Sequence, residues 1–149
     1  MHGRPYRRLL AMAVLSFVAM YVLMYAMVNV LANAIPNLNQ FYMAGLMAAP
    51  MVIIEVLVMR SMYPNWRWNA AILATSGLAL LAFWVGIRQQ LAITDREFLK
   101  SMIPHHAGAI LMCEKADPKS PEIKQLCSDI VSSQQAEIDQ MKGLLRNGG

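Results

Sequence analysis

Acidic residues are nearly absent from the first two thirds of the chain. The first 94 of the 149 residues contain one carboxylate, Glu55, beside six arginines and no lysine. Charged residues make up only 15% of the whole sequence and hydrophobic residues 57%, which is too apolar for an ordinary soluble domain. The net charge of +4 comes from scattered arginines, so no nucleic-acid-binding surface is expected. The composition predicts a membrane protein.

Motifs for enzymatic chemistry are missing as well. The sequence has no glycine-rich phosphate loop and no Ser or Cys nucleophile paired with a base. It also lacks the Glu-x-x-His spacing of a ferritin-like di-iron centre, and its cysteine spacing matches no closed zinc motif. We therefore expect neither an enzyme nor an organic cofactor.

Three long apolar runs predict three transmembrane helices in a membrane domain of residues 1–93. The first run, residues 9–31, is uncharged and at about 1.5 Å per residue covers a bilayer core of about 30 Å. The other spans are expected at residues 41–62 and 70–87, with a short polar turn at 33–40. Residues 32–34 resemble a signal-peptidase site, but the run before them is longer than a signal-peptide core, so a retained anchor is preferred.

Arginines set the expected orientation. Three precede the first span, two lie between the second and third spans, and none lies between the first and second: Arg4, Arg7, Arg8, Arg60 and Arg67. Because positive loops stay in the cytoplasm, the N-terminus is expected inside and the C-terminal domain outside. In a bacterium this is the inner membrane, with the C-terminal domain in the oxidising periplasm or cell exterior.

Residues 94–149 predict an antiparallel helical hairpin. Thr94 and Glu97 have the spacing of a capping box, in which Thr94 caps a helix from residue 95 to about 116 and Glu97 reaches back to the N–H of Thr94. Ser120 and Pro121 have the N-cap and first-position pattern of a second helix, to about residue 146. A hairpin of about 50 residues is too small to bury a core alone. We expect either a homodimer that completes a four-helix bundle, or cover from a larger membrane complex.

Candidate ligands for a soft metal are concentrated in this hairpin. They are Met102, His105, His106, Met112, Cys113 and Met141. On a helix that turns about 100° per residue, Met102, His106 and Cys113 share one face, and His105 and Met112 lie on the adjoining flank. Thioether and imidazole ligands together favour Cu(I), and imidazole also binds Cu(II). The alternative is that the methionines only fill gaps in the core.

Folding the hairpin about its turn gives the expected partners of these residues. Gln134 lies opposite His106, so a neutral core histidine bonded to Gln134 is the alternative to metal binding, and Glu137 is a second supporting polar residue. Cys113 lies within about a turn of Cys127, close enough for the Cα separation of about 4.4–6.8 Å that a disulfide needs. In an oxidising compartment a disulfide is expected. A thiolate that contributes to a copper site and inert buried thiols are the alternatives.

The residues from about 95 to 145 carry a resemblance to a known family. The matching segments are Asp95–Leu99, Met102–His106, Ala109–Cys113, Pro121–Ile123, Leu126–Cys127 and Ser133–Met141. They resemble the bacterial family called domain of unknown function 305. The resemblance implies a ferritin-like helical fold and, for some members, periplasmic copper binding and copper tolerance through Met and His. Many members carry the hairpin twice and this chain carries it once, which also favours a homodimer.

The second predicted span suggests a rival function. Met43, Met47 and Met51 recur every four residues and lead to Glu55, a pattern that resembles eukaryotic-type copper uptake transporters. Those transporters place the N-terminus outside and have a Gly-x-x-x-Gly in the third span, whereas here the expected N-terminus is inside. We therefore expect a membrane-anchored, extracytoplasmic copper-binding protein for copper tolerance or handling. An accessory subunit of a larger complex and copper transport are the alternatives.

Overall fold

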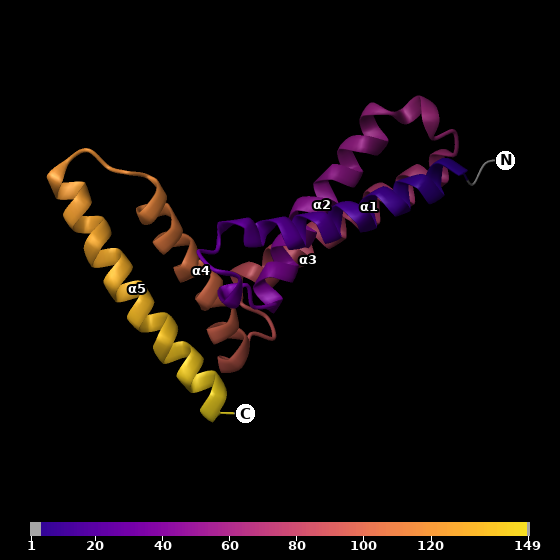
Figure 1. Ribbon diagram of the computed structural model, residues 1–149. Helices are drawn as coiled ribbons and strands as arrows, with labels where there is room; N and C mark the ends of the chain where they lie inside the picture. The colour runs from indigo at the N-terminus through magenta and orange to yellow at the C-terminus, as the bar shows by residue number, and fades with distance from the viewer. Residues whose placement is uncertain (1–3, 149) are drawn as a thin grey trace. The chain divides into compact units, whose positions relative to one another are not determined.

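The computed structural model describes residues 4–148 and contains only helices and the segments that connect them (Figure 1). The α-helices are α1 (Arg4–Leu23), α2 (Leu38–Val58), α3 (Trp66–Arg88), α4 (Asp95–Lys115) and α5 (Pro121–Asn147). Short 3-10 turns follow the first two of these helices: η1 (Met24–Met27), η2 (Leu31–Asn33) and η3 (Arg60–Met62). No strand occurs among residues 4–148, so the all-α prediction is confirmed.

The chain divides into two compact units. The membrane unit comprises Met1–Leu23 and Asn39–Ala92, and the hairpin unit comprises Met24–Leu38 and Ile93–Gly149. The three helices of the membrane unit are each long and apolar enough to cross a bilayer. Their number and order agree with the three predicted spans.

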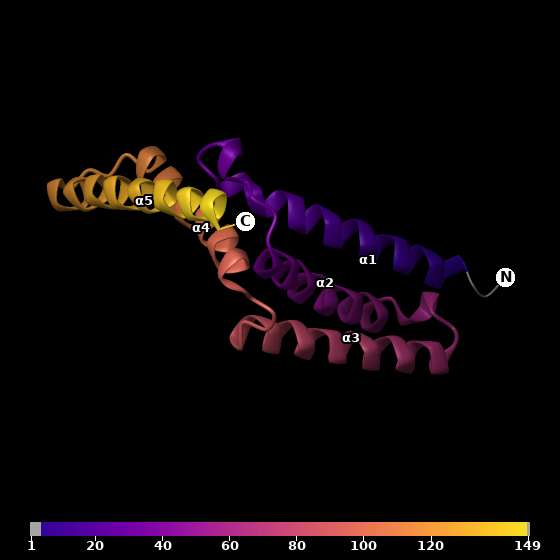
Figure 2. The same ribbon diagram turned by 90° about the horizontal axis from the view of Figure 1, so that it is seen from below.

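Helix α2 packs against both of its neighbours in the membrane unit (Figure 2). Its buried face carries small residues, namely Ala44, Gly45, Ala48 and Ala49. Gly45 faces the ring of Phe83 on α3 so closely that a Cβ at this position would overlap the ring. Towards α1, Phe41 packs edge-on against Phe17, with ring centroids 5.1 Å apart. Small side chains on α2 therefore allow the close approach of α3.

The two long helices of the hairpin unit begin where the sequence predicts. Thr94 accepts a hydrogen bond from the Glu97 N–H and caps α4, and Ser120 accepts one from the Ile123 N–H and caps α5. The other half of the predicted capping box is wrong. The Glu97 carboxylate does not return to the N–H of Thr94, because it binds the ammonium of Lys100 at 2.8 Å and the backbone N–H of Leu38 at 2.9 Å.

Residues 24–38 belong to the hairpin unit, although the sequence analysis placed them in the first span and the turn after it. Helix α1 ends at Leu23, and the Asn29 side chain then accepts hydrogen bonds from the Val30 N–H and from the side-chain amide of Asn33. Such local bonds to an Asn side chain compete with a continuing helix. Val28 and Ile35 pack against the core between α4 and α5. Part of the cover that the hairpin was expected to need thus comes from the same chain.

The core of the hairpin unit is a cluster of buried side chains between α4 and α5. Its members are Ile103, Ala107, Ile110, Ile138 and Met141. The largest of them are fully buried, and each such aliphatic side chain stabilises the fold by about 1.5–3 kcal/mol. This cluster fixes which faces of the two antiparallel helices meet.

The close contact between α2 and α3 leads to a prediction with a matched control. Gly45→Ala is expected to lower the melting temperature of the detergent-purified protein, because the overpacking cost of about 1–3 kcal/mol exceeds the helix-propensity gain of about 1 kcal/mol. Gly77→Ala on α3 meets no atom within 4 Å and should leave the melting temperature unchanged or raise it. Equal effects of the two substitutions would contradict the close packing.

The contact of Glu97 with residue 38 leads to a second prediction. Glu97→Gln is expected to weaken the docking of residues 24–38 by about 1–2 kcal/mol, seen as faster amide hydrogen exchange in that segment. The exposed Glu114→Gln is the matched control and should change nothing there.

The same carboxylate gives the docking a pH dependence. The hydrogen bond from Lys100, followed by that from Leu38, holds the pKa of Glu97 below its ordinary value of 4.5. A depressed pKa stabilises the fold fully above that ordinary value, and the stabilisation is lost as the pH falls through the lower native pKa. The protection of residues 24–38, which is the exchange rate relative to the intrinsic rate at the same pH, should therefore fall below about pH 4.5 in the wild type and much less in the Gln variant.

Candidate functional site

The centre of the candidate site is a hydrogen-bonded pair that joins α4 to α5. His106 is only 7% exposed, and its Nε2 lies 2.6 Å from a carboxylate oxygen of Glu137. The Glu137 side chain itself is 53% exposed, so one of its oxygens reaches inwards while the residue borders solvent. The partner of His106 is therefore Glu137, and the alternative that paired it with Gln134 is wrong by about one helical turn.

The second ring nitrogen of His106 has no such partner. Nδ1 is buried and makes no hydrogen bond to any residue from 4 to 148. A carboxylate at Nε2 favours the tautomer in which that nitrogen carries the proton, which leaves a lone pair on Nδ1. A carboxylate bonded to one nitrogen while the other is free is the arrangement that orients histidine metal ligands. A buried polar atom without a hydrogen-bond partner or a metal lowers the stability of the fold by about 1–3 kcal/mol.

Two thioethers lie one turn from this pair. Because α4 and α5 are antiparallel, a step of four residues back on α4 and four forward on α5 leads from His106 and Glu137 to Met102 and Met141. Met141 is part of the buried core cluster, and Met102 packs against the same cluster. The structure thus brings one imidazole and two thioethers, all among the predicted ligands, to the same region of the hairpin. We call Met102, His106 and Met141 the inner group.

The other predicted ligands lie outside the inner group. His105 is exposed, with its ring centroid 6.1 Å from that of His106, and the side chain of Met112 is 54% exposed. Cys113 forms a disulfide with Cys127, with Cα atoms 5.2 Å apart. This bond withholds both sulfurs from a metal and joins α4 to α5 near the connecting turn.

Among residues 4–148, no three His, Cys, Asp or Glu side chains are grouped closely enough to hold a metal. His106 and Glu137 supply two groups of this kind, and the remaining donors nearby are thioethers. Imidazole and thioether donors together are typical of sites for soft ions.

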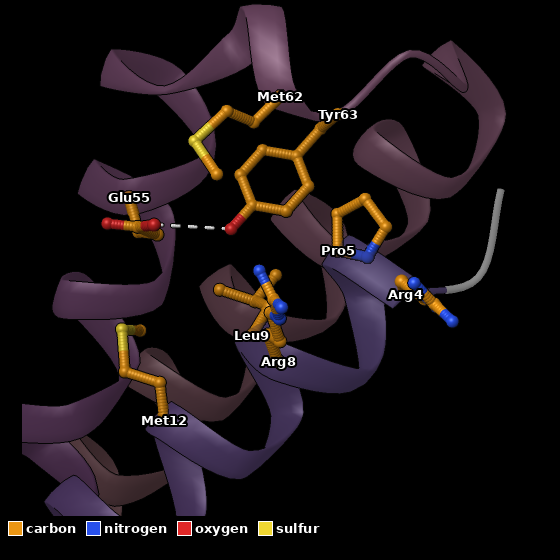
Figure 3. Close-up of a pocket in the computed structure, with 8 residues that line it drawn as sticks. All are labelled: Arg4, Pro5, Arg8, Leu9, Met12, Glu55, Met62 and Tyr63. Atoms are coloured by element: carbon orange, nitrogen blue, oxygen red, sulfur yellow. Dashed lines mark hydrogen bonds between the residues drawn. The ribbon is translucent and has the colours of Figure 1, made fainter. Parts of the chain in front are cut away.

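The methionines of the second span do not form an inward-facing path. Met43 and Met47 lie on the exposed surface of the membrane unit, and Met51 is half-buried. Glu55 accepts a hydrogen bond from the hydroxyl of Tyr63 at 3.2 Å and borders a pocket at the end of α2 (Figure 3). Two of the three methionines thus lie on the surface of the single chain, and copper transport through this span stays an untested alternative.

Sequence reasoning named Glu97 only as half of a capping box and missed Asn33. Glu97 ties α4 to residue 38. Asn33 is only 2% exposed; its side-chain amide donates to the side-chain oxygen of Asn29, and its own Oδ1 has no partner among the described residues. The pair of asparagines four apart in an apolar run was the available signal, since Asn favours turns over helix interiors.

The disulfide leads to a stability prediction. Replacing both Cys113 and Cys127 by Ser is expected to lower the free energy of unfolding of the hairpin unit by about 3 kcal/mol, the value for a closed loop of about 15 residues. A reducing agent should lower the stability of the wild type by a similar amount and leave the double variant unchanged. Two titratable thiols in unreduced, denatured wild-type protein would contradict the bond.

Comparisons with known proteins identify a domain that includes the helical hairpin. Residues 86–145 match the family model described as Domain of unknown function (DUF305). An uncharacterised protein of Acanthamoeba polyphaga mimivirus is 36% identical over 140 residues, which cover 92% of this chain and 90% of that protein. No solved structure matches the chain. The family match contains the whole inner group and both cysteines, and the chain belongs to the family of this domain of unknown function.

Proposed function

We propose that this is a membrane-anchored, extracytoplasmic copper-binding protein that contributes to copper tolerance or copper handling. The observation that supports it most directly is His106, a buried imidazole with Nε2 bonded to Glu137 and Nδ1 without a partner. A metal at Nδ1 would satisfy an atom that is otherwise costly to bury. The thioethers of Met102 and Met141 in the same region favour Cu(I) over harder ions.

The roles of the residues follow from their exposure. The inner group supplies the ligands, and Glu137 holds the imidazole in the required tautomer. His105 and Met112 are exposed on the flanking surface, where they can take copper from solution before it reaches the inner group. Cys113 is a structural residue in this proposal, because its sulfur is bonded to Cys127.

Charge and disulfide chemistry support the proposed location. Arginines flank the membrane helices at the N-terminus and between α2 and α3, whereas residues 24–38 between α1 and α2 carry no charge. The positive-inside rule then puts the N-terminus in the cytoplasm and the hairpin unit on the outer side, such as a bacterial periplasm. A disulfide is expected to persist in that compartment and not in a reducing cytosol.

Apolar side chains on the hairpin support a partner. Ile123, Leu126 and Leu144 on α5 are each more than half exposed. A second copy of the hairpin that covered them would complete a four-helix bundle, and a subunit of a larger membrane complex would serve the same purpose. Light scattering of the detergent-purified chain distinguishes a homodimer from a monomer that awaits another protein.

Copper binding is tested on the full chain in detergent. Cu(I) titrated against a chromogenic chelator should bind at one ion per chain, and His106→Ala should weaken it at least as much as the roughly 10–100-fold loss typical of an orienting residue. Met102→Leu with Met141→Leu should weaken binding and remove sulfur scattering from the copper X-ray absorption spectrum. The Cu(I) affinity of the Glu137→Gln protein should lie between the affinities of these variants and that of the wild type.

The controls come from residues of the same types elsewhere in the chain. His2→Ala and the exposed Glu114→Gln should bind Cu(I) as the wild type does. Equal affinity of the His106→Ala and His2→Ala proteins, both folded by circular dichroism, would sink the copper proposal. A loss caused by His105→Ala alone would move the site to the exposed flank.

A further inference from the structure

The membrane unit contains a pocket that the copper proposal does not use. It has a volume of about 380 Å³, within the usual range for small-molecule sites, and lies between the start of α1 and the end of α2 (Figure 3). Arg4 and Arg8 line it from α1, Glu55 lines it from α2, and Tyr63 lines it from the loop after η3. The pocket thus carries charges of both signs on different helices.

A network of hydrogen bonds holds the walls of this pocket together. The Tyr6 hydroxyl lies 2.9 Å from the side-chain oxygen of Asn69, to which it donates, and accepts a hydrogen bond from the Asn65 N–H at 3.1 Å. The side-chain amide of Asn69 in turn donates to the carbonyl of Tyr63 at 2.8 Å. The first turns of α1 are therefore tied to the loop between α2 and α3.

The charges that line the pocket do not neutralise one another. Tyr63, 4% exposed, is the only hydrogen-bond partner of the Glu55 carboxylate among the described residues, and neither Arg4 nor Arg8 comes within 4.0 Å of that carboxylate. Glu55 lies one turn from the end of a helix that is apolar enough to span a membrane. A carboxylate at such a depth is costly unless a cation or a water-filled cavity accompanies it.

We propose that this pocket binds the headgroup of an aminophospholipid, whose phosphate and primary ammonium are joined by a short linker. The phosphate is held by Arg4 and Arg8, because guanidinium groups bind phosphate oxygens with paired N–H donors. The ammonium is held by Glu55, which accepts hydrogen bonds from its N–H groups. Leu9 and Met12 continue the wall along α1 in the direction of the acyl chains.

The position of the pocket in the membrane unit favours a lipid as the occupant. The ring of Tyr6 packs beside those of Tyr63 and Trp68 on its loop side, and such aromatic residues gather where headgroups lie. A purely anionic headgroup would place its charge near Glu55 without compensation. A quaternary ammonium cannot donate a hydrogen bond to that carboxylate. The pocket should therefore prefer phosphatidylethanolamine to phosphatidylglycerol and phosphatidylcholine.

The test is native mass spectrometry of the full chain in mild detergent, titrated with dioleoyl lipids of these three headgroups. The wild type should bind one phosphatidylethanolamine about ten-fold more tightly than either other lipid, the size of one partly screened charge interaction. Glu55→Gln should abolish the preference for phosphatidylethanolamine over phosphatidylglycerol. Arg8→Gln should weaken the binding of all three lipids. Arg7→Gln is the matched control, since Arg7 does not line the pocket.

Several outcomes would overturn the proposal. They are equal affinity for the three lipids, unchanged selectivity in Glu55→Gln protein, and an equal loss in the Arg7→Gln and Arg8→Gln proteins. If free O-phosphoethanolamine binds as tightly as phosphatidylethanolamine, the occupant is a soluble zwitterion, and the assignment of a lipid is overturned. Tyr63→Phe keeps the ring and should reduce selectivity only partly, so it tests the site even where Glu55→Gln unfolds. The proposal rests on the membrane placement and not on copper, so a failed Cu(I) titration leaves it standing.

Discussion

The register of α4 against α5 is the constraint on which the hairpin unit depends. The disulfide joins the helices near the turn, and the buried cluster around Ile103, Ile110 and Ile138 fixes their facing sides further along. With that register His106 meets Glu137, and Met102 and Met141, one turn away, pack in or against the same buried cluster. A slip by one turn would put Gln134 at the imidazole, and a neutral amide would not favour one tautomer as a carboxylate does. The chemistry of the candidate site therefore follows from packing.

The cover supplied by residues 24–38 follows from the size of the hairpin. Two helices bury only one stripe each and leave part of the core open, so a third element is needed. Here Val28 and Ile35 supply apolar contacts, and Glu97 anchors the end of the segment at residue 38. A single charged hydrogen bond contributes only about 1.5–3 kcal/mol, so the segment is held mainly by burial of its apolar side chains.

Local signals allowed the element types to be predicted, and long-range geometry set the limit. Thr94, Ser120 and the apolar runs act within a few residues, so the caps, the hairpin and the three long apolar helices were predictable. The end of α1 at Leu23 was not predictable, because the residues after it are as apolar as those before it, whether they face lipid or the core of the protein. The stripe with Met102 and His106 was predictable from helical periodicity. Glu137 was predicted only as a supporting polar residue, and the choice of Glu137 over Gln134 as the partner of His106 was not predictable, because the facing residue depends on loop length and helix rotation.

Besides Oδ1 of Asn33, two polar groups have incomplete bonding among the described residues: Nδ1 of His106 in the hairpin unit, and the carboxylate of Glu55 in the membrane unit, whose only partner is the Tyr63 hydroxyl. Folding selects against such groups, since an unsatisfied buried donor or acceptor consumes a sizeable part of a net stability of about 5–15 kcal/mol. Replacing either side chain by an apolar one would stabilise the isolated chain unless another molecule completes its bonding. The different surroundings underlie the two proposed ligands: thioethers beside an imidazole favour a soft cation, and arginines across from a carboxylate favour a zwitterion.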